Sequence, residues 1–141
     1  MICRALPTKT IEWIVMKYLK MFRKWKDVEE HSAQTVLFTE GTPADALYVI
    51  TSGEVELSLR GEPLGTEVAG GIIGEMAILP SAKRNTTATA LTDVKLARLT
   101  RYQLEMLMTK NPDFSLHVMA ILADRLRTVN HYITVQFDSA Q

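Results

Sequence analysis

The feature that most constrains this chain is its central region, residues 28–100, in which short apolar runs alternate with turn residues. The runs are rich in Val, Leu, Tyr and Thr, which favour strands, and Gly and Pro interrupt the chain between them. The turns are expected at 41–43, 52–53, 60–63 and 70–71. Many short strands at this spacing are typical of a compact all-β barrel or sandwich.

Four segments of this region have the strongest strand character: residues 46–50, 55–59, 86–91 and 94–99. In the second segment, Val55, Leu57 and Leu59 alternate with polar residues. Because successive side chains of a strand point to opposite sides, this alternation predicts one buried face and one solvated face.

Residues 1–27 predict a basic amphipathic helix. Its apolar residues follow helical spacing and are accompanied by basic ones: Ile11, Ile14, Val15, Tyr18, Leu19, Phe22 and Trp25, with Lys17, Lys20, Arg23, Lys24 and Lys26. We expect the apolar side to pack on the rest of the domain and the cationic side to face solvent. A partner or lipid surface is the alternative for such a helix.

Two helices are predicted after the barrel, over residues 101–109 and 112–135. Thr100 and Gln103 have the spacing of a capping box, in which each side chain bonds a free backbone amide of the other residue. Asn111 precedes Pro112, a pattern that places a capping side chain before proline at the first helical position. The chain therefore divides into an N-terminal helix (1–27), a barrel (28–100) and C-terminal helices (101–135) of one domain.

The last helix carries residues at alternating three- and four-residue steps, as in a coiled-coil seam. They are Leu116, Met119, Ala123, Leu126, Asn130, Ile133 and Phe137. We expect the first half of this stripe to lie on the barrel. Beyond Leu126 little chain remains to cover it, so the second half predicts a homodimer formed with another copy of the helix.

Composition narrows the functional classes. With 141 residues the chain fits one domain, and 16 basic residues balance 16 acidic ones, so no overall field attracts nucleic acid or anionic lipid. The single cysteine, Cys3, allows no internal disulfide, and the longest apolar stretch is too short to span a membrane. We expect a cytoplasmic protein. The three histidines are scattered, and no metal site, cofactor or catalytic group is evident, so we expect no enzyme.

Residues 74–88 carry the most informative chemistry. Gly74 lacks a side chain where a ligand could approach the backbone, and residues 75–79 can form one helical turn before Pro80 ends it. Arg84 supplies a cation that can bind two phosphate oxygens, whereas Glu75 suits a hydroxyl of the same ligand. These residues support a sugar phosphate or nucleotide, and an ordinary loop with a surface Arg–Glu pair is an equal alternative.

The segment resembles the phosphate-binding cassette of the cyclic nucleotide-binding domain family, found in the bacterial catabolite activator protein, protein kinase A regulatory subunits and nucleotide-gated channels. Residues 38–41, 46–55 and 70–75 are similar to further signatures of that family, in the same order. The resemblance covers about residues 28–133. It implies a mainly β fold with flanking helices, an eight-stranded jelly-roll barrel whose last helix acts as a lid or dimer helix.

The resemblance also implies the ligand and its contacts. The ligand is a purine 3′,5′-cyclic nucleotide, for which we expect cyclic AMP rather than cyclic GMP. Glu75 would bind the ribose 2′-hydroxyl and Arg84 the cyclic phosphate, with help from Gly74. The remaining implied contacts are Met76, Ala77, the side chain of Asn85, the backbone of Thr86, and Val129 and Asn130 near the base.

Some positions depart from the family pattern. Asn85 and Thr86 stand where a small pair such as Ser-Ala is common, Lys83 where Pro is frequent, and Gly71 where Asp is usual. The alternative function is therefore an adaptor that keeps the barrel and works through protein contacts without ligand. Only eight residues follow Ile133, too few for a helix-turn-helix, so we expect no direct binding to DNA.

Overall fold

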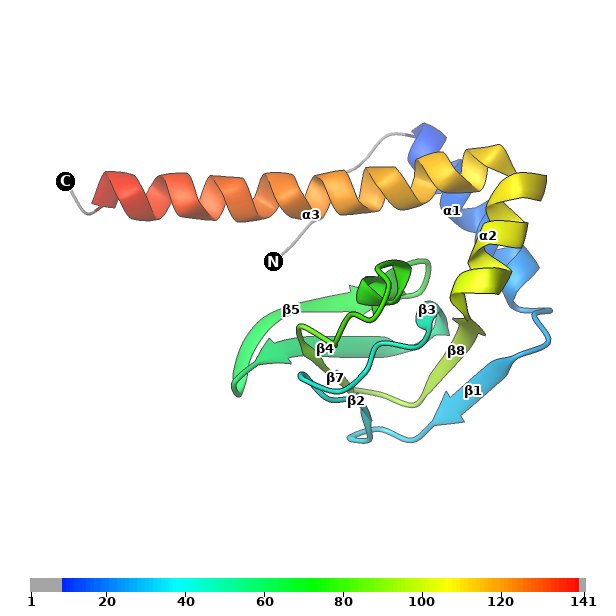
Figure 1. Ribbon diagram of the computed structural model, residues 1–141, viewed down its shortest axis with the longest axis horizontal. Coiled ribbons are helices and arrows are strands. Elements are labelled where there is room, and N and C mark those ends of the chain that lie inside the picture. The colour runs from blue at the N-terminus through cyan, green and yellow to red at the C-terminus, as the bar shows by residue number, and fades with distance from the viewer. Residues whose placement is uncertain (1–8, 140–141) are drawn as a thin grey trace.

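The computed structural model describes residues 9–139 of the chain (Figure 1). Helix α1 (Lys9–Phe22) precedes eight strands, and helices α2 (Arg101–Lys110) and α3 (Pro112–Ser139) follow them. The strands are β1 (Val28–His31), β2 (Val36–Phe38), β3 (Leu47–Ser52), β4 (Glu54–Leu59), β5 (Glu62–Val68), β6 (Ile72–Ile73), β7 (Thr87–Ala90) and β8 (Val94–Leu99). A short 3-10 helix, η1 (Glu75–Ile78), lies between β6 and β7.

The strands form two four-stranded antiparallel sheets, in the orders β1-β8-β3-β6 and β2-β7-β4-β5. One hydrophobic core joins them, because Ile50 and Leu96 of the first sheet pack with Val55 and Ala88 of the second. The predicted fold class, an eight-stranded jelly-roll with flanking helices, is confirmed. The four expected strands are present, with ends that move by up to two residues.

The predicted alternation in β4 is only partly correct. Val55 is fully buried, but Leu57 is half-buried and Leu59 is exposed. The register of β4 against β5 shifts between Leu57 and Ser58, next to the hairpin that joins the two strands. Such an irregularity bends the strand and redirects the side chains that follow it. The two-residue period therefore describes only the part of β4 that lies over the core.

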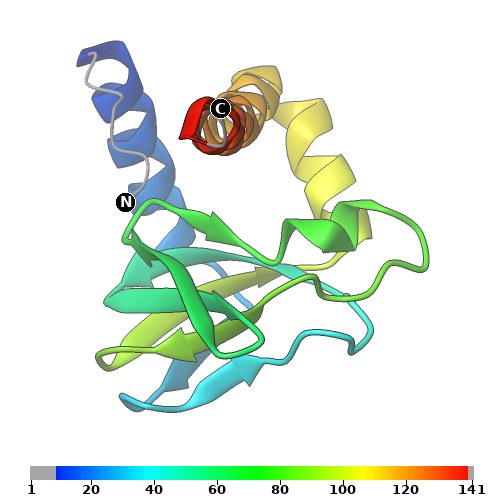
Figure 2. The same cartoon turned by 90° about the vertical axis from the view of Figure 1, so that its left-hand side faces the viewer.

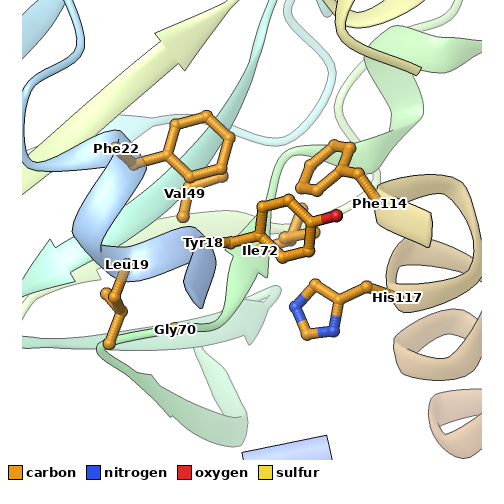
Figure 3. A pocket seen from close by; sticks show the side chains of 8 residues that line it. All are labelled: Tyr18, Leu19, Phe22, Val49, Gly70, Ile72, Phe114 and His117. Carbon is orange, nitrogen blue, oxygen red and sulfur yellow. The ribbon is translucent and has the colours of Figure 1, made fainter. Parts of the chain in front are cut away.

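Helices α1, α2 and α3 all lie on the same side of the strands (Figure 2). Phe22 and Tyr18 of α1 are buried against Phe114 of α3, and Tyr18 stacks on His117 at a centroid distance of 5.8 Å. Figure 3 shows these rings converging above Ile72, and the space between them is too narrow for a water molecule. As predicted, the apolar side of α1 packs on the domain through Tyr18 and Phe22, and Lys20 is exposed. The helix ends at Phe22, so Trp25 lies beyond it, and the side chains of residues 11–15 are outside the described part of the chain.

The boundary between α2 and α3 differs in one detail from the sequence prediction. The capping box is present, since the Thr100 hydroxyl accepts from the Gln103 amide and the Gln103 side chain accepts from the Thr100 amide. Pro112 begins α3 as expected. The Asn111 side chain, however, donates to the Leu107 carbonyl at 3.4 Å, so it satisfies the end of α2 instead of capping α3.

The prediction that the first half of the α3 stripe lies on the barrel is wrong. Leu116 is 65% exposed and Met119 and Ala123 are also exposed, so this part of the stripe does not lie on the barrel. The neighbouring side of the helix does so through Phe114, His117 and Val118. Farther along, Leu126, Asn130 and Ile133 are exposed, while the side chain of Phe137 lies outside the described residues. In Figure 1 the C-terminal end of α3 projects past the ends of the strands.

Candidate functional site

Gly74 joins β6 to η1 in a conformation that requires glycine. Its φ is +77°, in the left-handed region. A Cβ atom there would lie 2.6 Å from the Arg84 Nη1 and 3.2 Å from the Ala46 carbonyl oxygen. The missing side chain therefore lets the guanidinium of Arg84 approach the backbone, and the predicted helical turn after Gly74 follows as η1.

Arg84 lies between η1 and β7, and its side chain is buried, with the residue only 4% exposed. Its Nη1 donates to the Gly74 carbonyl at 3.0 Å and its Nη2 donates to the Ala46 carbonyl at 2.7 Å. The guanidinium carbon lies 4.3 Å from the ring centre of Phe38 and 5.9 Å from that of Tyr48. Burial lowers the pKa of Arg84 from its usual high value. The alternative of a surface Arg–Glu pair is therefore wrong, because this cation is buried and held by backbone.

One nitrogen of Arg84 is not satisfied: its Nε is buried and has no hydrogen-bond partner within residues 9–139. A buried polar donor without a partner costs free energy, and a cationic one costs more. An anion that reached this nitrogen would remove that cost. Arg84 therefore keeps one donor that no group within residues 9–139 satisfies.

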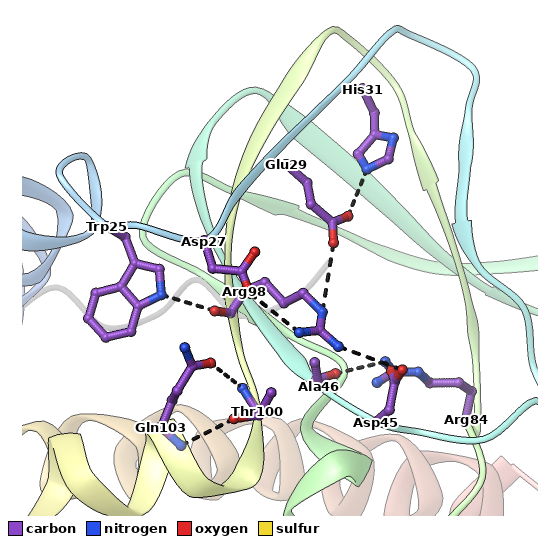
Figure 4. Close-up of polar contacts among 10 residues, drawn as sticks. All are labelled: Trp25, Asp27, Glu29, His31, Asp45, Ala46, Arg84, Arg98, Thr100 and Gln103. Atoms are coloured by element: carbon purple, nitrogen blue, oxygen red, sulfur yellow. Dashed lines mark hydrogen bonds and ion pairs between the residues drawn. The ribbon is translucent and has the colours of Figure 1, made fainter.

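One acidic residue, Asp45, lies beside Arg84 and also faces Arg98 (Figure 4). Asp45 lies 3.4 Å from the Arg84 Nη2 and 3.7 Å from the Arg98 Nη2. Arg98 in turn pairs with Asp27 at 3.3 Å and Glu29 at 3.8 Å. Asp45 has no signal in the sequence beyond its position just before β3, because pairing across the fold leaves no local pattern.

Glu75 is held by a residue of α3. The Arg125 Nη1 lies 3.1 Å from the Glu75 Oε2, and the Arg125 Nη2 lies 3.5 Å from the Glu67 Oε2. Arg125 also donates to the Ile72 carbonyl. Arg125 is not among the residues predicted from the sequence, because its contact with Glu75 depends on how α3 crosses the barrel. Helical spacing offered one signal: Arg125 lies one turn before Val129, which the resemblance implies near the base.

Gly71, where the family usually has Asp, has a local explanation. A Cβ at this position would lie 2.8 Å from the Glu67 Oε1 and 3.0 Å from the Val68 carbonyl oxygen. The side chain of Glu67 thus occupies space that an aspartate would need. This glycine accompanies the approach of Glu67 to Arg125.

The other predicted contacts are either neighbours of Gly74 and Arg84 in the sequence or residues of α3. Met76 and Ala77 continue η1, where Ala77 is buried in the core shared with the helices. Asn85 is exposed and Thr86 is half-buried in the loop between Arg84 and β7. Val129 and Asn130 are exposed on α3, one turn beyond Arg125. The structure therefore brings Gly74 and Arg84 together, while no contact within residues 9–139 joins Val129 or Asn130 to them.

Residues 9–139 contain no group of three or more His, Cys, Asp or Glu side chains that could hold a metal ion. No helix among them is both long enough and apolar enough to cross a membrane. His117 is buried in packing, His31 bonds Glu29 at 2.9 Å, and His131 is exposed.

A family model described as the cyclic nucleotide-binding domain matches residues 28–111, which is more than half of the chain. The chain belongs to the cyclic nucleotide-binding domain family. The matched range begins at β1, includes Gly74, Glu75 and Arg84, and ends between α2 and α3. This cyclic nucleotide-binding domain thus has its strands, η1 and α2 within the family match, and the whole of α3 beyond it.

The curated relatives of the domain are longer proteins, and this chain aligns with only a part of each. The CRP-like cAMP-activated global transcriptional regulator of Mycobacterium tuberculosis is 34% identical over 101 residues, which cover 67% of this chain and 45% of the regulator. The cGMP-dependent protein kinase egl-4 of Caenorhabditis elegans is 43% identical over 68 residues, covering 48% of this chain and 9% of the kinase. The chain therefore matches less than half the length of these relatives.

Solved structures share the fold. The Thermus thermophilus catabolite activator protein superposes with a TM-score of 0.70 at 24% identity, covering 92% of this chain and 60% of that one. The half-site-occupied form of the EAL enzyme Bd1971 gives a TM-score of 0.58 at 30% identity, covering 74% and 97%. Such domains thus occur in regulators and also in multidomain enzymes.

Proposed function

We propose that this cyclic nucleotide-binding domain is a regulatory module that binds a purine 3′,5′-cyclic nucleotide and has no catalytic role. The observation that carries this proposal is Arg84. It is a buried cation beside a glycine that must lack a side chain, and its Nε has no partner. A phosphate at this position would form charge-assisted hydrogen bonds in a low-dielectric setting, where they are strong.

The phosphate end of the ligand is assigned to the barrel. Arg84 pairs with the cyclic phosphate through Nε, while its two terminal nitrogens keep their bonds to the backbone carbonyls. Gly74 allows close approach, and Asn85 and the backbone amide of Thr86 add neutral donors. The exposed position of Asn85 supports this role, because an amide side chain there can turn toward the ligand.

The ribose end is assigned to η1 and α3. Glu75 accepts a hydrogen bond from the 2′-hydroxyl, and Met76 and Ala77 line the approach. A carboxylate has two oxygens with several acceptor positions, so Glu75 can bind a hydroxyl and keep its ion pair with Arg125. Val129 and Asn130, one turn beyond Arg125, are assigned to the base. Signalling through α3 follows, since the ligand and the helix share Glu75.

Cyclic AMP is the proposed ligand rather than cyclic GMP. The relative aligned over two thirds of the chain is a cAMP-activated regulator, whereas the cGMP-dependent kinase aligns over about half of it. The EAL enzyme Bd1971 has been solved in both cAMP-bound and cGMP-bound forms, which makes the choice between the two purines a question for direct titration.

The proposal is tested by calorimetric titration of the full chain with cyclic AMP, cyclic GMP and 5′-AMP. Saturable binding of cyclic AMP, weaker binding of cyclic GMP and none of 5′-AMP is the expected result. Absence of heat and of any thermal shift with both cyclic nucleotides at millimolar concentration would overturn the proposal in favour of the adaptor function.

We propose further that the domain forms a homodimer through α3, and that it acts in the cytoplasm without contacting DNA directly. The support is the exposed stripe on α3, in which Leu126 is 61% exposed and Ile133 is also exposed. A single polar residue in such a seam, here Asn130, costs stability but fixes register. The two-fold pairing of α3 with a second copy would bury the stripe along its whole length.

The dimer is tested with the double substitution Leu126→Asp and Ile133→Asp. Light scattering should show a dimer for the wild type and a monomer for the variant, whose circular dichroism should keep the β signal of the barrel. The pair Lys20→Asp and Lys24→Asp, at exposed positions outside the stripe, is the control and should remain dimeric. A wild type that is monomeric at high concentration, with and without cyclic AMP, would contradict the dimer.

A further inference from the structure

A groove lies between α2 and the segment that connects α1 to β1, outside the site described above. Its volume is about 370 Å³. The side chains that line it are Trp25, Lys26, Tyr102, Gln103, Met106, Leu107 and Lys110. None of these residues belongs to the site of Gly74, Glu75 and Arg84, and none lies on the stripe of α3.

The inner surface of the groove is apolar. Tyr102 is 70% exposed and Met106 is 41% exposed, although both are large side chains that favour burial. They share one side of α2 with Lys110, because residues three to four positions apart lie on the same side of a helix. Trp25 lines the other side of the groove, from the segment between α1 and β1. Its indole nitrogen donates to the Arg98 carbonyl at 2.9 Å.

The charge of the groove has one sign. Lys26 and Lys110 are exposed, and neither has an ion pair or hydrogen bond within residues 9–139. The acidic neighbours in sequence are paired elsewhere, because Asp27 binds Arg98 at 3.3 Å and Glu105 binds Arg101 at 3.3 Å on α2. Two lysines beside exposed apolar surface therefore lack an anionic partner.

Gln103, the remaining polar residue of the lining, can also donate a hydrogen bond to a ligand. The side-chain oxygen of Gln103 is occupied by the Thr100 amide in the capping box at 2.8 Å, so its NH2 group is the part left to bind a ligand. Lys26, Lys110 and Gln103 thus offer donors to one small space. The groove accordingly complements a molecule with an apolar body and an acidic head.

We propose that this groove is a second ligand site, which binds a small amphipathic anion with an alkyl or aromatic body and a carboxylate head. The body would cover Trp25, Met106 and Leu107, and the head would lie between Lys26 and Lys110. The volume is at the lower end of the range of about 300–1,000 Å³ for small-molecule sites, which favours a small ligand over a protein helix. The site does not depend on the proposed cyclic nucleotide function.

The test uses sodium octanoate as the anionic probe and 1-octanol as its neutral match, titrated into the full chain and followed by two-dimensional amide NMR. Octanoate should shift the signals of the groove residues, the Trp25 indole N–H among them, in a saturable manner below its micelle concentration. Octanol should bind at least about threefold more weakly, because it lacks the charge that Lys26 and Lys110 attract. The same shifts should appear when cyclic AMP is present.

Two variants of the groove and one matched control sharpen the result. Lys110→Glu and, independently, Lys26→Glu should each weaken octanoate binding by about fivefold or more at low salt, since each removes an attraction and adds a repulsion. Lys20→Glu, with the same charge change at an exposed position of α1, should bind octanoate like the wild type. Shifts confined to the α3 stripe, no saturable shift, or equal binding by Lys110→Glu, Lys26→Glu and the wild type would each overturn the proposal.

Discussion

Arg84 and Glu75 are the two charged residues of the candidate site, and different parts of the molecule hold them. Arg84 is buried, and its contacts come from residues in and around the barrel, chiefly the carbonyls of Gly74 and Ala46. Glu75 is partly exposed, and its ion pair comes from Arg125 on α3. The end of the site that we propose for the phosphate is therefore built around the barrel, while the end that we propose for the ribose is shared with a helix.

This difference indicates how the domain could transmit a signal. Within residues 9–139 Arg84 has no hydrogen bond or ion pair with α3, so a ligand held by Arg84 alone would act on this helix only indirectly. A ligand at Glu75 changes the environment of Arg125, and an equilibrium between positions of α3 responds only to such differential contacts. Affinity should thus depend most on Arg84, and coupling to the helix should depend on Glu75 and Arg125.

The largest expected effect comes from Arg84→Ala. Loss of a charge-assisted hydrogen bond of about 1.5–3 kcal/mol predicts that affinity for cyclic AMP falls by about tenfold to more than a hundredfold. The substitution also leaves the carbonyls of Gly74 and Ala46 without their donor, which should lower the free energy of unfolding by about 1–3 kcal/mol. Calorimetry and urea denaturation measure the two effects.

Arg84→Lys is the matched variant for this prediction. It keeps the positive charge but not the planar fork that joins two carbonyls and a phosphate, so its affinity should lie between those of the wild type and Arg84→Ala. If Arg84→Ala remained folded and bound cyclic AMP as tightly as the wild type, the phosphate end would not be at Arg84.

A smaller effect is expected from Arg125→Gln. The ion pair with Glu75 is only partly buried, so its loss should weaken cyclic AMP binding by about threefold to tenfold. The loss should be much smaller for 2′-deoxy cyclic AMP, which has no 2′-hydroxyl to donate a hydrogen bond to Glu75. Lys20→Gln, at an exposed position of α1, serves as the control. An equal loss for both ligands would mean that Arg125 supports the fold and does not orient Glu75.

The smallest effect concerns how α3 is attached to the rest of the molecule. Burial lowers the pKa of His117 below its usual value of about 6.5, so the unfolded chain takes up this proton more readily than the folded one. The free energy of unfolding should therefore fall as pH drops through about 6.5. His117→Phe should lack this contribution, whereas a substitution at the exposed His131 should retain it. Urea denaturation across this pH range checks the prediction.

The parts of the molecule that were predicted from the sequence are those with local causes. Turn residues set the strands, the Thr100 and Gln103 pair sets the start of α2, and Gly74 marks a position where the backbone needs glycine. The resemblance to the family placed Glu75 and Arg84 in one site. Each of these signals lies within a few residues of the feature it predicts.

The parts that were not predicted depend on how elements pack. Arg125 and Asp45 reach the site from α3 and from the start of β3, and spacing along the chain does not reveal such meetings. Leu116 and Phe114 are two residues apart on one amphipathic helix, and only the crossing of α3 over the barrel decides which is buried. Asn111 fits a cap for either neighbouring helix, and the packing of α2 settles its partner.

The most direct test of a site with separate phosphate and ribose ends is calorimetric titration of the wild type with cyclic AMP and with 2′-deoxy cyclic AMP. Both ligands keep the phosphate that Arg84 would bind, and only the first offers a hydroxyl to Glu75. Saturable binding of both, with the deoxy ligand weaker by about tenfold, is the predicted result, since a hydrogen bond to a charged group is worth about 1.5–3 kcal/mol. Equal affinities would remove Glu75 from the site, and the absence of binding by either ligand would contradict the assignment as a whole.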